Sequence, residues 1–212
     1  MAVLFAAAAI LVFLSTVLAL RWLIPKLKSM KMGQKILEIG PRWHKSKEGT
    51  PTMGGIAFAV PLTIVCALSL VALKWFDMGD GLPLALTLLL AVGNGIIGCV
   101  DDLTKFHKKQ NEGLTAAQKF ALQLAMAGAF ISLMKLYGMI DTVLVIPFTE
   151  IHLELGWFYY VFALVFITGM INSVNLTDGI DGLAASVTCV VAAFFAVLAF
   201  MCANVGLAVL AG

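Results

Sequence analysis

Long apolar runs dominate this sequence and limit what it can fold into. Of its 212 residues, 61% are hydrophobic and only 12% are charged, whereas a soluble domain carries roughly a quarter charged residues. Six runs are long enough, or nearly so, for the ~20 residues that a membrane-spanning helix needs. They lie at about Ala2–Leu23, Gly55–Leu73, Leu82–Val100, Ala116–Tyr137, Trp157–Val174 and Leu183–Leu210. We therefore expect an all-α integral membrane protein with about six transmembrane helices, forming one domain over residues 1–212.

Lysine and arginine are concentrated at two of the loops between these runs, whereas the second and fourth loops carry mainly acidic residues. The basic residues are Arg21, Lys26, Lys28, Lys31, Lys35, Arg42, Lys45 and Lys47 at the first loop, and Lys105, Lys108, Lys109 and Lys119 at the third. Because basic loops stay in the cytoplasm, the N-terminus is expected outside and the first, third and fifth loops inside. The fifth loop has no basic residue, so alternation alone determines its side. The acids Asp101, Asp102, Asp178 and Asp181 are thus expected on one cytoplasmic face.

Two adjacent acids, Asp101 and Asp102, directly follow the third apolar run. Ionised carboxylates at a bilayer boundary are costly unless they are solvated, paired or bound to a metal. Neighbouring helical positions point about 100° apart, so one acid could accept a proton or hold Mg²⁺ while the other orients a neighbour. The alternative is a pair of solvated helix-end acids whose charge is offset by Lys105, Lys108 and Lys109.

A second polar cluster follows the fifth apolar run. It consists of Asn172, Asn175, Thr177, Asp178 and Asp181. The two acids would share a face if this stretch were helical. The neighbouring glycines would allow an irregular backbone, which is tolerated near membrane depth only against protein or a water-filled cavity. An ordinary cytoplasmic turn needs fewer polar residues, so the pattern favours a ligand site.

A third segment, Lys47–Gly55, opens the second run and has two interpretations. In the first it is a turn and helix start, with Pro51 near the first turn and Thr50 or Thr52 as the cap. In the second, backbone N–H groups, hydroxyls and Lys47 contact a phosphate or diphosphate at a helix N-terminus. It does not match the P-loop pattern.

Together these segments resemble the motifs of a known family. They are Gly49-Thr50-Pro51-Thr52-Met53-Gly54-Gly55, Asp101-Asp102-Leu103-Thr104-Lys105 and Asn172–Gly182. In this order they are similar to the bacterial phospho-N-acetylmuramoyl-pentapeptide-transferase family, a branch of the polyprenyl-phosphate N-acetylhexosamine-1-phosphate transferase superfamily (glycosyltransferase family 4). The acidic motifs are shared across the superfamily, and the Thr-Pro-Thr-Met-Gly-Gly segment favours the muramoyl-pentapeptide branch.

The resemblance implies Mg²⁺-dependent transfer of phospho-MurNAc-pentapeptide from UDP-MurNAc-pentapeptide to undecaprenyl phosphate, giving lipid I and UMP in peptidoglycan biosynthesis. It implies that Asp101 and Asp102 are the paired catalytic acids, one of which deprotonates the lipid phosphate or acts as the nucleophile. The implied metal ligands are Asp101, Asp102 and Asp178. The implied substrate-binding residues are Lys47, Thr52, Asn172, Asn175, Asp178, Asp181, Lys105, Lys109 and Lys119.

The same resemblance implies a multi-pass protein of the bacterial inner membrane with its active site on the cytoplasmic face. Its partners would be the two substrates and the lipid bilayer; nucleic acid is not expected, and a homodimer is left open. Family members have about ten spans, and a further metal-binding Asp and a His-rich loop lie downstream of the position of Gly212. We therefore expect the chain to be an N-terminal portion of such an enzyme, incomplete at the C-terminus. Whether this portion is active by itself is left open.

Three alternatives accompany this interpretation. A related UDP-GlcNAc:polyprenyl-phosphate GlcNAc-1-phosphate transferase would use the same acidic motifs with another donor. A secondary transporter would place its coupling residues near the midplane of the bilayer, whereas both acidic clusters here follow apolar runs. An inactive truncated membrane remnant would keep the motifs without the activity.

Overall fold

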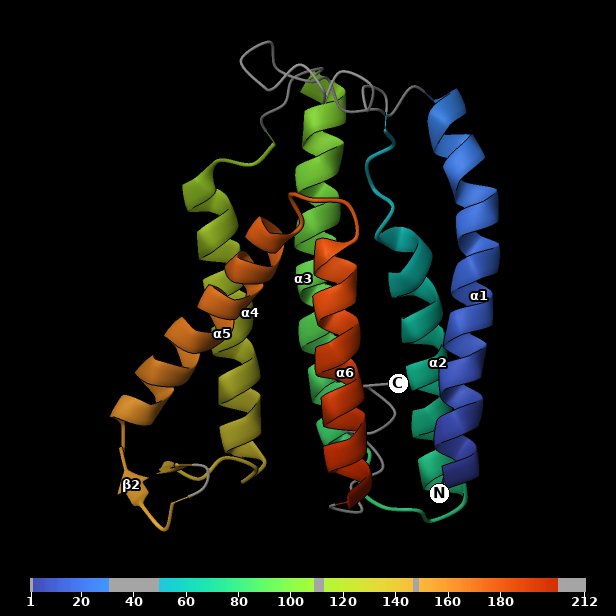
Figure 1. Ribbon diagram of the computed structural model, residues 1–212. Coiled ribbons are helices and arrows are strands. Elements are labelled where there is room, and N and C mark those ends of the chain that lie inside the picture. Colours follow the sequence, from blue (N-terminus) through green and yellow to red (C-terminus); the bar gives the residue numbers. More distant parts are fainter. Residues whose placement is uncertain (1, 31–49, 109–112, 147–148, 202–212) are drawn as a thin grey trace.

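The computed structural model describes residues 2–30, 50–108, 113–146 and 149–201. This part of the chain consists of helices and one short β-hairpin (Figure 1). The elements are α1 (Ala2–Ser29), α2 (Ile56–Trp75), α3 (Leu82–Lys108), α4 (Ala116–Leu136), β1 (Val143–Val145), β2 (His152–Glu154), α5 (Phe158–Thr177) and α6 (Leu183–Met201). The expectation of an essentially all-α membrane fold is confirmed, with the hairpin as the exception.

The helices have the length and composition that a bilayer requires. Among the described residues, α1 to α5 are long and apolar enough to span a membrane, and the apolar stretch assigned to α6, Leu183–Leu198, is shorter. The predicted sixth run continues to Leu210, but residues 202–212 lie outside the described part. In the most apolar windows of α1 and α5, only 6% of the residues are buried inside the protein. Apolar side chains exposed on this scale indicate a membrane environment.

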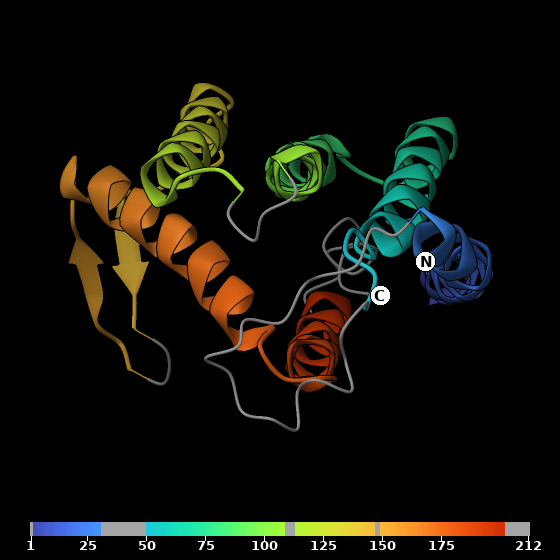
Figure 2. The ribbon, with the colours of Figure 1, turned by 90° about the horizontal axis from the view of Figure 1, so that it is seen from above.

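Each helix packs against the next one in the sequence, from α1 through to α6. Seen from above, α1 to α4 follow an open arc and α5 runs obliquely to them (Figure 2). A buried apolar cluster joins α1, α2 and α3; its members are Ala8, Val65, Cys66, Leu73, Leu84 and Leu88. This packing fixes α3 against α2, so the polar end of α3 lies beside the segment that leads into α2.

Alternating helix directions bring the polar segments to one end of the bundle. The ends of α1, α3 and α5 and the starts of α2, α4 and α6 all lie at the upper end in Figure 1, and the hairpin lies at the opposite end. The two acidic clusters, which follow the third and fifth apolar runs, are therefore on the same side of the bundle. The predicted common side is confirmed for these two clusters.

Helices α1 and α3 continue furthest past their apolar runs. Helix α1 extends to Ser29 rather than ending near Leu23, and α3 extends to Lys108 rather than ending at Val100. Lysine, aspartate and serine are compatible with helical backbone once the chain has left the hydrocarbon, so the end of an apolar run does not end a helix. Asp101 and Asp102 therefore lie within α3 and not at its end.

The β-hairpin replaces the loop predicted between the fourth and fifth runs. Its strands pair antiparallel, with Val143 opposite Glu154, Leu144 opposite Leu153 and Val145 opposite His152. Strands of three residues are too short to produce a period-2 pattern that can be recognised in the sequence.

The structure decides two points about helix ends that the sequence left open. The N-terminal cap residue of α2 is Gly55, so the cap position belongs to a glycine and not to Thr50 or Thr52. Helix α5 ends at Thr177 with Asp178 as its C-terminal cap residue, so Asp178 and Asp181 do not share a helical face. Gly182, with a φ of 81°, lies in the left-handed turn that follows and leads into α6.

Candidate active site around the aspartate pair

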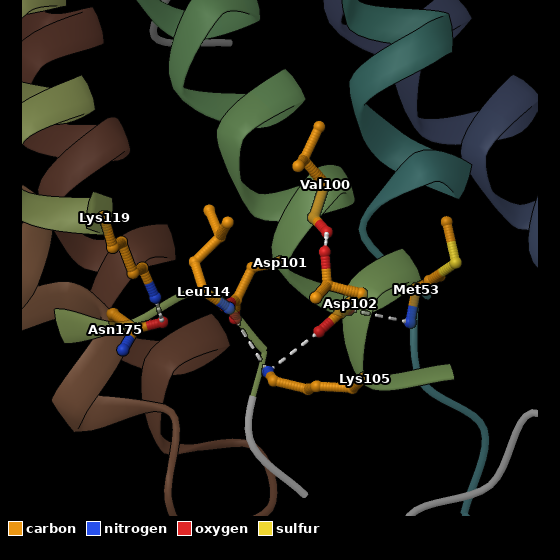
Figure 3. A network of polar contacts seen from close by, with 9 residues as sticks. Met53, Val100, Asp101, Asp102, Lys105, Leu114, Lys119 and Asn175 are labelled. Atoms are coloured by element: carbon orange, nitrogen blue, oxygen red, sulfur yellow. Dashed lines mark hydrogen bonds and ion pairs between the residues drawn. The ribbon is translucent and has the colours of Figure 1, made fainter. Parts of the chain in front are cut away.

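Lys105 lies between the carboxylates of Asp101 and Asp102 (Figure 3). Its Nζ is 2.8 Å from Oδ2 of Asp101 and 3.1 Å from Oδ1 of Asp102. Positions three and four residues apart share one face of a helix, so a single lysine reaches both acids. The cluster of two acids and one lysine keeps one negative charge, which suits it to bind a cation or accept a proton.

Asp101 is held on its other side by the loop that precedes α4. Its Oδ1 accepts a hydrogen bond of 2.8 Å from the backbone N–H of Leu114. Only 7% of the residue is exposed, and a buried carboxylate needs hydrogen-bond partners. Leu114 and Lys105 supply one partner for each oxygen, so the carboxylate has one fixed orientation.

Asp102 is held in the same manner by the turn that precedes α2. Its Oδ2 accepts a hydrogen bond of 3.2 Å from the backbone N–H of Met53. Met53 has a φ of 67°, a left-handed conformation that costs a residue with a side chain roughly 1–2 kcal/mol. In one of the two interpretations of this segment, its backbone N–H groups contact a phosphate or diphosphate. The Met53 N–H instead binds a carboxylate of the protein itself, and contact with a phosphate stays a prediction.

The two carboxylates differ in accessibility. The side chain of Asp101 is 10% exposed and that of Asp102 is 29% exposed. A ligand that approaches the pair from solvent therefore meets more of Asp102. Each acid is nevertheless restrained by Lys105 and by its own backbone N–H donor, Leu114 for Asp101 and Met53 for Asp102. The pair is therefore preorganised.

Helix α4 begins with a capping box that fixes the loop beside Asp101. The hydroxyl of Thr115 accepts from the N–H of Gln118 at 3.2 Å, and the Gln118 side chain accepts from the N–H of Thr115 at 3.0 Å. This reciprocal pair satisfies two backbone donors at the start of the helix. Leu114, whose N–H binds Asp101, directly precedes this capping residue.

Lys119, in the first turn of α4, connects the aspartate pair with α5. Its Nζ donates to Oδ1 of Asn175 at 3.3 Å, and it lies near enough to Asp101 to interact with it electrostatically (Figure 3). Two of the predicted substrate-binding residues are thus brought together beside the predicted catalytic acids. Lys119 reaches the site from α4, whereas Lys105 reaches it from α3.

The side chain of Asn172 bonds to neighbouring helix residues and does not stand in an open position. Its Nδ2 donates to Oε1 of Gln123 at 2.7 Å and to the backbone oxygen of Thr168 at 2.8 Å. Gln123 is only 2% exposed. The structure therefore gives Asn172 the task of joining α5 to α4, and a contact with substrate stays a prediction for this residue.

The remaining predicted residues are dispersed or lie outside the described part. Thr52 is half-buried in the turn beside Met53, and Asp178 and Asp181 are exposed after α5. Lys47 and Lys109 lie outside the described residues. Within the part of the chain that the structure describes, no three His, Cys, Asp or Glu side chains form a group that could hold a metal ion. Asp178 accordingly does not join the aspartate pair, and the three-acid metal site stays a prediction.

The sequence interpretation missed the Leu114 donor, and it missed that the Met53 N–H binds Asp102. Main-chain N–H groups leave no trace in a pattern of side chains, and Leu114 is an ordinary apolar residue. One signal was available: Thr115 and Gln118 have the spacing of a capping box, which indicates a fixed loop just before α4.

Comparison with known proteins agrees with this arrangement. The sequence profile described as Glycosyl transferase family 4 matches residues 84–212, a range that includes both acidic clusters. The chain belongs to glycosyl transferase family 4. In addition, residues 47–58 match signature 1 of phospho-N-acetylmuramoyl-pentapeptide-transferase. That signature includes Met53, whose N–H holds Asp102.

Curated relatives carry the name phospho-N-acetylmuramoyl-pentapeptide-transferase. The protein from Staphylococcus carnosus is 42% identical over 198 residues, which cover 92% of this chain and 60% of the relative. Those from Staphylococcus haemolyticus and Staphylococcus aureus are 40% and 39% identical over 195 residues, covering 91% of this chain and 59% of each relative. The chain thus spans about 60% of the length of the curated relatives that it matches.

Proposed function

We propose that this protein transfers phospho-MurNAc-pentapeptide from UDP-MurNAc-pentapeptide to undecaprenyl phosphate, giving lipid I and UMP. The observation that carries the proposal is the preorganised aspartate pair in the polar segment of α3, next to a turn that matches the transferase signature. The relatives' names support the same reaction. Because the chain spans about 60% of those relatives, the activity of the whole protein is part of the proposal.

The reaction joins two anions, so charge neutralisation is the first task of the site. Two unit charges 4 Å apart interact by about 4 kcal/mol at an effective dielectric constant of about 20. Lys105 and Lys119 lie at the aspartate pair and approach from different helices. Their positive charges would reduce the repulsion between the lipid phosphate and the diphosphate of the donor.

The second task, proton transfer or nucleophilic attack, belongs to the carboxylates. One of them would take the proton of the lipid phosphate, whose oxygen then forms a bond to the sugar-linked phosphorus of the donor. The bond from that phosphorus to the bridging oxygen breaks, and UMP leaves. In the alternative, the carboxylate first attacks this phosphorus and expels UMP, and an oxygen of the lipid phosphate then attacks the phosphorus and displaces the carboxylate. Phosphoryl transfer depends mainly on positioning and electrostatic stabilisation, and both acids have fixed orientations.

The donor set of the pair suits Mg²⁺. This ion prefers oxygen ligands and is usually held by one or two carboxylates together with substrate phosphates, so a group of three protein ligands is not required. Asp101 and Asp102 are adjacent carboxylates of one helix and would hold it. When bound, the ion supplies positive charge for the diphosphate and the departing UMP.

The membrane location fits a lipid acceptor. Several apolar helices make this a multi-pass membrane protein. The basic residues of the first and third loops support an orientation in which the aspartate end faces the cytoplasm at the bacterial inner membrane. A nucleotide-linked donor would be available on that side.

The test is a transferase assay with the gene product in membranes or nanodiscs. Incubation with UDP-MurNAc-pentapeptide and undecaprenyl phosphate should release UMP and form lipid I, whereas UDP-GlcNAc should not replace the donor. Asp101→Asn and Asp102→Asn should each lower the rate at least about 100-fold, since each removes a carboxylate charge from the reacting site. Turnover of UDP-GlcNAc instead would assign the protein to the related branch. If neither donor yields UMP, the proposal is contradicted.

A further inference from the structure

Gly113 lies directly against Asp101 and leaves no room for a side chain. A Cβ placed on Gly113 would be 2.6 Å from the backbone oxygen of Asp101 and 2.9 Å from its Cγ, with Oδ1 nearer still. These separations are well inside van der Waals contact. The backbone oxygen belongs to α3 and cannot retreat unless the helix moves. Any side chain at position 113 must therefore push away the loop, the carboxylate or both.

This close approach is specific to Gly113 among the glycines of the described residues. A Cβ added to Gly95 or Gly98, on α3 itself, would have nothing within 4 Å, and one added to Gly93 would meet the flexible end of Met126. No other glycine in the described ranges would bring a Cβ within 3.0 Å of a backbone atom. Ordinary helix packing of small residues does not account for the contact at Gly113.

The described residues just before α4, Gly113–Thr115, cannot easily move to relieve such a clash. Leu114, the next residue, donates its N–H to Oδ1 of Asp101 at 2.8 Å. Thr115, the residue after that, is fixed by the capping box of α4. A displaced loop would lose the bond to a buried carboxylate, strain the start of α4, or both. The hydrogen bond from Leu114 to Asp101 therefore depends on the absence of a side chain at Gly113.

We propose that Gly113 is a positioning residue for Asp101. The absence of a side chain lets the loop close on α3, so that the Leu114 N–H fixes Oδ1 and Oδ2 remains directed at Lys105. The role of Asp101 in catalysis rests on the proposed function, whereas the contact between Gly113 and Asp101 does not. Catalytic groups need placement within about 0.5 Å, and a misplacement of about 1 Å can cost 100-fold in rate.

The first test measures hydrogen exchange of backbone amides and needs no activity. In the purified protein, Gly113→Ala should speed exchange of the Leu114 amide about tenfold or more, the loss expected for a hydrogen bond to a charged acceptor. The Met53 amide, which bonds to Asp102, should exchange as before. Gly98→Ala is the matched control and should change neither amide. Unchanged exchange at Leu114 in Gly113→Ala would overturn the proposal.

A second comparison does not require Gly113→Ala to fold. Asp101→Ala should expose the Leu114 amide and leave Met53 protected, and Asp102→Ala should do the reverse. If the Leu114 amide already exchanges freely in the wild-type protein, or is unaffected by Asp101→Ala, the proposal is wrong.

The third test separates positioning from a general loss of structure. Gly113→Ala should lower kcat about tenfold or more while KM for the nucleotide donor changes less than about twofold, because the glycine contacts Asp101 and not the donor. In an Asp101→Asn background the same substitution should have almost no further effect. Independent, multiplicative losses would overturn the proposal. A wild-type protein that releases no UMP would contradict the proposed function alone, and the exchange results would then decide the role of Gly113.

Discussion

The hydrogen bond between Asn172 and Gln123 predicts a stability defect that a substrate-binding role would not produce. Gln123 is almost fully buried, and its Oε1 accepts from Asn172 at 2.7 Å. Replacing Asn172 with leucine leaves that oxygen without its donor, and the Thr168 carbonyl loses its second bond. An unsatisfied buried polar group costs about 1–3 kcal/mol. Hydrogen bonds between membrane helices average only about 0.6 kcal/mol, with a maximum near 1.7 kcal/mol.

For Asn172→Leu we therefore expect a loss of about 1–2 kcal/mol in the free energy of unfolding, between these two limits. Gln123→Leu should cost a similar amount, because it leaves the amide of Asn172 with only one acceptor. The double variant should cost less than the sum of the two, with a coupling of about 0.5–1.5 kcal/mol. The measurement is reversible unfolding of the protein in mixed detergent micelles, with helix content as the signal.

Activity supplies the control. If Asn172 acts through packing, Asn172→Leu should change KM for the donor by less than about threefold at a temperature where the protein stays folded. Additive losses of stability, or no loss at all together with a large rise in KM, would refute the packing role and restore the substrate-binding one.

Three further outcomes follow from the site. Met53→Gly should raise the free energy of unfolding by about 1 kcal/mol because glycine adopts a positive φ without penalty, and Met53→Val should lower it; thermal unfolding distinguishes them. Thr115→Ala should lower stability by about 1 kcal/mol through loss of the capping box, and Thr115→Ser should restore most of it in the same assay. Chelation of divalent ions should abolish UMP release and added Mg²⁺ should restore it, whereas chelator-resistant turnover would argue against a metal at the aspartate pair.

The sequence predicted the helices well because their signal is long and repeated. Runs of about 20 apolar residues indicate membrane spans without any tertiary information. Their polar ends were less predictable: α3 continues to Lys108, since hydropathy marks where the hydrocarbon ends and not where helical hydrogen bonding ends. The hairpin of Val143–Val145 with His152–Glu154 was missed because three residues per strand carry no usable period.

The candidate site was predictable in its charged side chains and not in its backbone. Asp101, Asp102 and Lys105 form one cluster because they are near in sequence and share a helix. Asn172 illustrates the opposite case: its proximity in sequence to Asn175 suggested a common task, yet the helix directs its amide at Gln123. Which face of a helix meets a neighbour is decided by tertiary packing, which the local pattern of residues does not reveal.

The arrangement of the backbone donors gives a reason why the acids lie inside α3 rather than at its end. From that position each carboxylate faces a different neighbour: Asp102 meets the turn before α2 through Met53, and Asp101 meets the loop before α4 through Leu114. Acids on a frayed helix end would have neither restraint. The packing of α2 and α4 against α3 is thus coupled to the orientation of both carboxylates. A substitution that shifts either helix start should therefore affect catalysis even when it contacts no substrate.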